Sequence, residues 1–156
     1  MFLVVGLAVV GMALGFLLIG TKGNHLELNG TILKVRVLPL SSASLVIVDF
    51  RVTDPSDVPF IMKGATLTLE PASGPTLDGM TVSKTDIENV FKYNPILGPK
   101  FNDVLGINDR IQPHQRLDRM VGARFEIPEA QAEDRKAIHL HVEEMGGLTV
   151  DLVEKK

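Results

Sequence analysis

Two histidines and a glutamate, His139, His141 and Glu143, stand at alternate positions near the C-terminus. Side chains two residues apart point to the same face of a strand, so all three share one face. Two imidazoles and a carboxylate can bind Zn²⁺ or Cu²⁺, with any further ligand coming from His25, His114 or an aspartate. The other interpretation is a solvated outer face, because the intervening residues are apolar and must fill the core. We expect no cofactor and keep the three residues as candidate metal ligands.

No catalytic motif surrounds the other polar residues of the sequence. Ser41-Ser42 lacks the Gly-x-Ser-x-Gly turn of a hydrolase nucleophile, and Gly146-Gly147 is typical of a hairpin rather than a phosphate-binding loop. The sequence contains 0 cysteines, which excludes disulfides, thiolate metal sites and covalent haem attachment. We therefore predict that the protein is not an enzyme.

The elements that must position these side chains are short alternating runs separated by Pro- and Gly-rich turns. Alternation predicts strands at 26–38, 44–53, 60–70, 80–82, 117–127, from 138 onward and at 148–152. A short helix is predicted at 83–93, where Ser83 can cap the first turn, and 128–137 is helix-permissive. The pattern predicts a mainly β fold, namely an immunoglobulin-like antiparallel β-sandwich with one or two short helices.

Two parts of this domain, its first strand and its longest irregular stretch, allow more detailed predictions. Alternation in the first strand separates two sets of residues, with Leu33, Val35 and Val37 on one face and Lys34 and Arg36 on the other. Asn29-Gly30 in the same run suits either a two-residue hairpin turn or a β-bulge. The stretch 96–112 has no regular pattern and is longer than a simple sandwich loop needs.

The first twenty residues carry no charged side chain and are almost wholly apolar. A helix of about 18–20 residues spans roughly 27–30 Å, the thickness of a bilayer core. A cleavable signal peptide would have a basic start and a small-x-small cleavage site, and the sequence has neither. The predicted organisation is a transmembrane helix at 1–21, a linker at 22–25 and a β-sandwich domain at 26–156.

Small residues lie along one side of the predicted membrane helix, at Ala8, Gly11 and Gly15. Small residues three or four positions apart let a second helix approach closely in lipid, so we expect this side to dock against another membrane subunit. The alternative is that glycine is simply common in membrane helices, and Gly6 and Gly20 point to the opposite side.

The orientation of the predicted anchor rests on opposing signals. Lys22 follows the helix, which weakly favours a cytoplasmic domain, whereas an anchor with almost no preceding tail favours export of a bacterial domain. We expect a single-pass protein whose domain is periplasmic or otherwise extracytoplasmic. The net charge of −3 and the lack of a basic patch argue against nucleic acid as a partner.

A second candidate surface is the apolar segment that contains Tyr93, Pro95, Ile96 and Leu97, at the end of the predicted helix. Ile96 and Leu97 either cap the sandwich core or belong to an exposed patch that docks a partner. We keep the four residues as candidate partner contacts.

Residues 46–70, VIVDFRVTDPSDVPFIMKGATLTLE, resemble the late-embryogenesis-abundant water-stress and hypersensitive-response (WHy) family. That family has an apolar strand, an Asn-Pro turn, a short polar stretch and a second strand, and here Asp54-Pro55 stands where Asn-Pro is usual. Ile111-Gln112-Pro113 is also similar to the family pattern, whereas the helix and loop at 83–109 depart from it. The resemblance implies an immunoglobulin-like sandwich with a binding or protective role, and it supplies no catalytic residues.

A membrane helix with a docking side and a domain without catalytic motifs predict a non-catalytic accessory subunit of a larger membrane protein complex. Respiratory and photosynthetic electron-transfer complexes are candidate hosts. Its expected partners are the lipid bilayer and neighbouring membrane-protein subunits, contacted through the helix and the domain surface. The alternative is a free-standing, membrane-anchored WHy-like module for stress protection or ligand binding.

Overall fold

The computed structural model describes residues 26–156. The predicted membrane helix at 1–21, the linker at 22–25 and the side formed by Ala8, Gly11 and Gly15 lie outside the described residues. Within 26–156, no helix is both long enough and apolar enough to cross a membrane.

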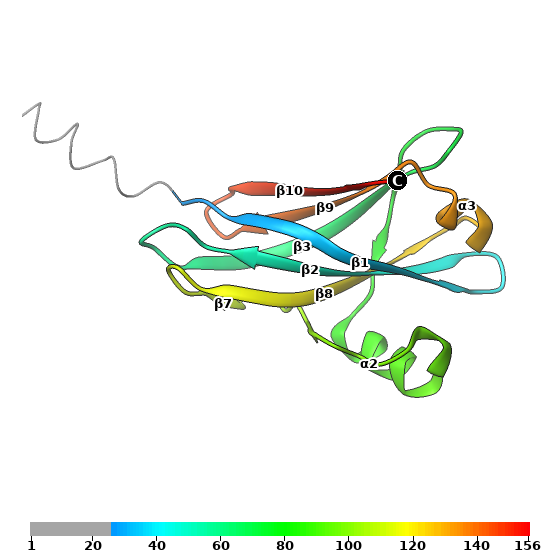
Figure 1. The fold of residues 1–156 in the computed structure, drawn as a ribbon, viewed down its shortest axis with the longest axis horizontal. Coiled ribbons are helices and arrows are strands. Elements are labelled where there is room, and N and C mark those ends of the chain that lie inside the picture. The colour runs from blue at the N-terminus through cyan, green and yellow to red at the C-terminus, as the bar shows by residue number, and fades with distance from the viewer. Residues whose placement is uncertain (1–25) are drawn as a thin grey trace, which may run out of the picture.

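Two five-stranded sheets pack face to face (Figure 1). The strands of the first sheet are, in order of pairing, β1 (Asn29–Pro39), β2 (Ser44–Thr53), β8 (Arg116–Phe125) and β5 (Met80–Thr81), with β6 (Asp103–Val104) also on β8. Those of the second sheet are β10 (Thr149–Lys155), β9 (Ala137–Glu144), β3 (Phe60–Glu70) and β4 (Leu77–Asp78), with β7 (Arg110–Ile111) also on β3. The short pair β6–β8 is parallel and the long strands pair antiparallel.

Three short helical segments complete the described chain: α2 (Lys84–Tyr93), the 3₁₀ turn η2 (Pro95–Leu97) and α3 (Glu129–Glu133). The protein is therefore a mainly β, two-sheet antiparallel sandwich with two short α-helices, which confirms the prediction at this level. The two strands with the clearest alternation, at 44–53 and 60–70, have the predicted bounds.

The main core lies between the two sheets. Val46, Val48 and Phe50 point inward from β2 and are fully buried. Leu67 and Leu69 point inward from β3 and belong to the same cluster. Burying each such side chain contributes roughly 1.5–3 kcal/mol, so this alternation holds the sheets together.

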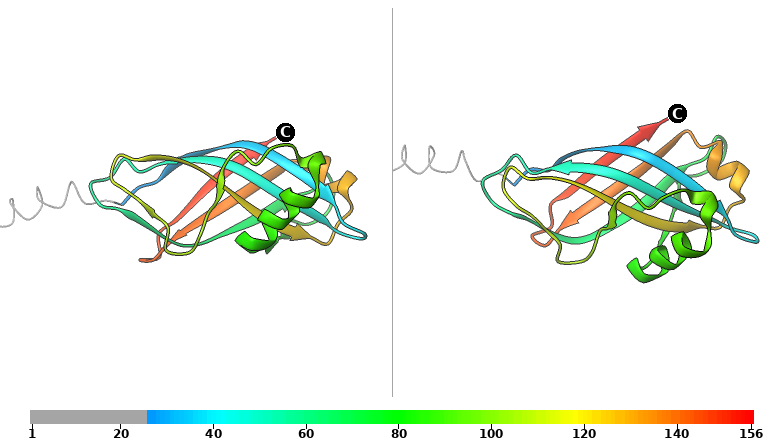
Figure 2. Two further views of the ribbon diagram at one scale, coloured as in Figure 1. Left: turned by 90° about the horizontal axis from the view of Figure 1, so that it is seen from below. Right: turned by 60° about the horizontal axis from the view of Figure 1, so that its bottom comes forward.

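A second apolar cluster lies on the outer side of the first sheet, where α2 packs against it (Figure 2). It joins Ile47 of β2 and Met120 of β8 to Ile87 of α2, and all three are fully buried. A Cβ atom at Gly122 of β8 would lie 3.0 Å from Cδ1 of Ile87. Glycine at this position therefore lets the helix approach the sheet closely.

Strand β1 departs from its predicted alternation. The register with β2 shifts between Ile32 and Lys34, so Leu33 is the extra residue of a β-bulge and is exposed. The prediction of a hairpin turn or bulge at Asn29-Gly30 is wrong, because these residues pair with β2 as the start of β1. Gly30 is required for another reason: a Cβ there would lie 2.8 Å from Cδ1 of Leu152 on β10.

The stretch 96–112 is also more ordered than its sequence pattern predicts. It contains β6 and β7, which pair with β8 and β3 respectively, and the end of η2. Each of these strands is two residues long, which is too short for alternation to be read.

Candidate functional site

The two histidines of the predicted metal site lie on the outer side of β9, which pairs with β3 on one side and with β10 on the other. Their rings are stacked, with centroids 6.2 Å apart and planes 10° from parallel. His139 Nε2 lies 2.9 Å from Oε1 of Glu70, on β3. His141 Nε2 lies 2.8 Å from the hydroxyl of Thr68, and its Nδ1 contacts the Asp151 carboxylate of β10. Each imidazole thus has a carboxylate neighbour of its own.

The third predicted ligand has a different partner. Glu143 accepts a hydrogen bond of 2.6 Å from the Lys63 ammonium. His114 lies 3.1 Å from Asp57, and His25 is outside the described residues. In the part of the chain that the structure covers, no three His, Asp or Glu side chains are grouped to hold a metal ion. The outer face of β9 therefore carries separate pairs of side chains, each imidazole or carboxylate with its own partner.

The other predicted site, Tyr93 to Leu97, lies in the segment that leaves α2, here called the 93–101 loop. The guanidinium of Arg36 helps to hold this loop on the sheet. Arg36 of β1 donates from Nη1 to the carbonyls of Leu97 (3.3 Å) and Pro99 (3.2 Å). The Arg36 guanidinium also lies 5.0 Å from the ring centroid of Phe91 and 5.6 Å from that of Phe101. Cation–π contacts of this kind add to the hydrogen bonds.

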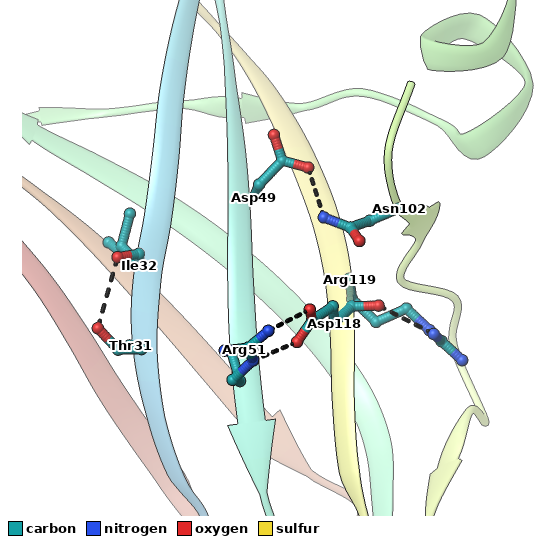
Figure 3. Close-up of polar contacts among 7 residues, drawn as sticks. All are labelled: Thr31, Ile32, Asp49, Arg51, Asn102, Asp118 and Arg119. Atoms are coloured by element: carbon teal, nitrogen blue, oxygen red, sulfur yellow. Dashed lines mark hydrogen bonds and ion pairs between the residues drawn. The ribbon is translucent and has the colours of Figure 1, made fainter. Parts of the chain in front are cut away.

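The charge of Arg36 is neutralised beneath the loop. Its Nη2 lies 2.5 Å from Oδ2 of Asp49, and the two side chains are only 5% and 4% exposed. The other oxygen of Asp49 accepts a hydrogen bond of 2.9 Å from Asn102, which follows the loop (Figure 3). Arg36 was predicted only as one side of an alternating strand, and its burial was missed. The available signal was in β2, where Leu45 and Ile47 share the outer face with Asp49.

The loop exposes some of its apolar residues and buries others. Ile96 is 85% exposed, Tyr93 70% and Phe101 65%, whereas Leu97 is only 6% exposed and belongs to the second cluster. Leu97 therefore packs in the second apolar cluster, whereas Ile96 lies at the surface. Of the four predicted contact residues, the structure leaves Tyr93, Pro95 and Ile96 at the surface.

A second ion pair lies on the same sheet, between β2 and β8. Arg51 donates from Nε and Nη2 to both oxygens of Asp118, at 2.6 and 2.7 Å (Figure 3). Each side chain is about one-third exposed. The hydrogen bonds from Arg51 hold the pKa of the Asp118 carboxyl below its ordinary value, and Asp118 in turn raises the pKa of Arg51.

No family model matches the chain, and no curated protein matches it. The membership in the WHy family suggested by residues 46–70 therefore stays a prediction. Among solved structures, the archaellum periplasmic stator protein FlaG from Sulfolobus acidocaldarius is similar at 12% identity and a TM-score of 0.38, over 82% of this chain and 100% of that one.

Two further solved structures are similar to this chain, with sequence identities and TM-scores close to those of FlaG. An uncharacterized β-sandwich protein from Clostridium difficile 630 is similar at 11% identity and a TM-score of 0.39, over 85% of this chain and 82% of that one. A structural genomics target, SoR45, is similar at 11% identity and a TM-score of 0.36, over 84% and 81%. At these scores the likenesses assign no family and no function.

Proposed function

We propose that this protein is a non-catalytic accessory subunit of a larger membrane protein complex, and that its 93–101 loop contacts a neighbouring subunit. The observation that carries the proposal is the exposure of Tyr93, Ile96 and Phe101 on a loop that is fixed from below. Single exposed apolar residues are ordinary on soluble surfaces, whereas contiguous apolar patches mark interaction sites, and these three residues belong to one loop.

The way the loop is held favours binding. Arg36 and Asp49 fix its backbone and its neighbour Asn102, so little conformational entropy remains to be lost when a partner docks. Lys92 and Lys34 lie 5.3 and 5.9 Å from the rings of Tyr93 and Phe101, which places a positive charge beside each of these two rings. A partner with an apolar centre and an acidic rim would match this surface.

The remaining parts of the proposal concern anchoring and topology. Residues 1–21 would cross the bilayer once and pack through Ala8, Gly11 and Gly15 on the host, with the domain on the extracytoplasmic side. Respiratory and photosynthetic electron-transfer complexes are the hosts that we favour. The strand orders β1-β2-β8-β5 and β10-β9-β3-β4 support an immunoglobulin-like arrangement, in which A-B-E-D packs on G-F-C.

A comparison of two exposed positions tests the proposal. Membranes are solubilised mildly and the full-length protein is followed on native gels, as wild type, as Ile96→Asp and as Met145→Asp. Met145 is 54% exposed in the turn between β9 and β10, which makes it a matched control. We expect a complex of high mass that Ile96→Asp weakens by about tenfold or more, whereas Met145→Asp leaves it intact. A lone wild-type monomer would contradict the proposal and favour the free-standing WHy-like module.

A further inference from the structure

One side of the sandwich is incompletely closed by strands. The outer edge of β8 pairs with β6 and with β5, and the pairing is interrupted between them at Val121. The edge of β3 pairs with β7 and with β4, and its interruption includes Ala65. Both residues line the same pocket, which lies at the seam between the two sheets.

This pocket is small and apolar. It has a volume of about 140 Å³ and is partly open to solvent. Among the residues described, no charged side chain lines the pocket. Its apolar lining includes Met62, Ala65, Val82, Val104, Leu105 and Val121. The Thr81 hydroxyl is already engaged, because it donates to the carbonyl of Ala65 at 3.3 Å. At the rim, Ile107 is 73% exposed.

The size of the pocket limits what it can hold. Sites for metabolites and drug-sized ligands are usually about 300–1,000 Å³, well above this volume. An apolar cavity of about 150 Å³ admits a benzene ring, which is the size of a phenylalanine side chain's ring. Near the centre of a protein interface, a few side chains that fill well-packed pockets supply most of the binding energy.

We propose that the pocket receives one hydrocarbon side chain, of leucine or phenylalanine size, from the protein that contacts the 93–101 loop. This inference rests on the proposed function. Val104 lines the pocket and belongs to the same apolar cluster as Leu97 of that loop, so one partner surface can reach the loop and the pocket together. Exposed Ile107 would be covered when the anchor enters.

The first experiment tests whether the pocket is open to a hydrocarbon, with benzene as the probe. Full-length protein in detergent is labelled with ¹³C at its methionine methyl groups, because Met62 lines the pocket and Met145 lies in the β9–β10 turn. We expect the methyl signal of Met62 to shift saturably with benzene, while that of Met145 shifts only weakly and linearly. A Met62 signal that does not shift, or shifts without saturation, overturns the proposal.

The second experiment fills the pocket. Ala65→Leu extends a side chain that packs against the core and lines the pocket. Ala72→Leu is the matched control, because it makes the same change at an exposed position that does not line the pocket. We expect Ala65→Leu to abolish the benzene shift and to weaken the native complex by about tenfold or more, with Ala72→Leu changing neither. Circular dichroism checks that both variants keep their strands.

A rim variant covers the case in which Ala65→Leu does not fold. Ile107→Ser removes apolar surface at the mouth, and we expect it to weaken the complex by about threefold. A complex that resists both Ala65→Leu and Ile107→Ser, although benzene binds, would assign the pocket to a free apolar ligand and overturn the proposal. That result leaves the Ile96→Asp effect in place, which distinguishes it from failure of the proposed function. A lone wild-type monomer overturns both.

Discussion

The outer faces of the two sheets differ in what covers them. On the first sheet, α2 and the 93–101 loop cover the outer face, and a second apolar cluster forms there with a buried ion pair, Arg36–Asp49. On the second sheet, no helix or loop among residues 26–156 covers the outer face at His139, His141 and their carboxylate neighbours, which are partly exposed. Both faces contain charged residues at alternate strand positions, so alternation alone does not distinguish a covered face from an open one.

Burial decides how strongly a charged pair affects the stability of this fold. Exposed ion pairs contribute about 0–1 kcal/mol, because water screens them and long side chains lose entropy. A buried pair has given up its hydration, so each charge depends on the other. We therefore expect the covered face to respond strongly to substitution and the open face to respond little.

The sharpest test of this contrast removes one member of the buried pair. Asp49→Ala leaves the Arg36 guanidinium buried without its carboxylate and removes the acceptor of Asn102. We expect the free energy of unfolding to fall by about 3–5 kcal/mol, measured by urea denaturation of the full-length protein. Glu143→Ala, which breaks an exposed pair with Lys63, should cost less than about 1 kcal/mol. Equal losses in the two variants would abolish the distinction between the faces.

The second test asks whether α2 is packed against the first sheet as tightly as the residues of the main core are packed between the sheets. Ile87→Ala removes most of the fully buried side chain of α2, which faces Ile47 and Gly122. We expect a loss of about 2–4 kcal/mol in the same denaturation experiment. Ile96→Ala, on the 93–101 loop that follows α2 and 85% exposed, should change stability by less than about 0.5 kcal/mol. A small effect of Ile87→Ala would mean that α2 is a loosely held appendage.

Local pattern predicted the parts of this fold that depend on neighbours in the sequence. The long strands β2 and β3 have period-two apolar runs bounded by Pro-rich turns, and α2 begins where Ser83 was expected to cap it. The bulge at Leu33 was not predictable, since a one-residue register shift depends on the partner strand. The burial of Arg36 was not predictable from its own strand, because its acceptor Leu97 lies 61 residues later in the chain and the only local signal was the apolar outer face of β2.

The candidate sites divide in the same way. The sequence predicted that His139, His141 and Glu143 share one face of a strand, and they do. Their partners come from β3 and β10, and the register of those strands against β9 cannot be predicted from a local pattern. Likewise, the sequence pointed to the segment at Ile96 and Leu97. Only the sheet beneath it decides which of these two side chains is buried.

A smaller loss of stability is expected from changes at Ser83, the N-cap of the helix α2 that covers the first sheet. Ser83 accepts a hydrogen bond of 3.2 Å from the Asp86 N–H and donates one of 2.7 Å to the Asp86 carboxylate. Ser83→Ala should therefore lower the free energy of unfolding by about 1 kcal/mol. Ser83→Asp keeps an acceptor at this position and should retain more of the stability than the alanine variant. If alanine and aspartate behave alike, the cap does not help to fix α2 on the sheet.

The smallest expected effect comes from Arg51–Asp118, a pair between the two extremes because each side chain is one-third exposed. Arg51 lowers the pKa of Asp118 in the folded protein, so the pair stabilises the fold fully above the unfolded pKa of about 4. The contribution is lost as the pH falls through the folded pKa, because the unfolded chain binds the proton more readily. The difference in the free energy of unfolding between wild type and Asp118→Asn should thus be largest above about pH 5 and shrink as the pH falls below the unfolded pKa of about 4. Denaturation measured across this range at low and at high salt checks both points, because a partly exposed pair is also weakened by salt. A difference that does not vary with pH would mean that Asp118 acts through packing, which would place this pair with the covered face rather than between the two.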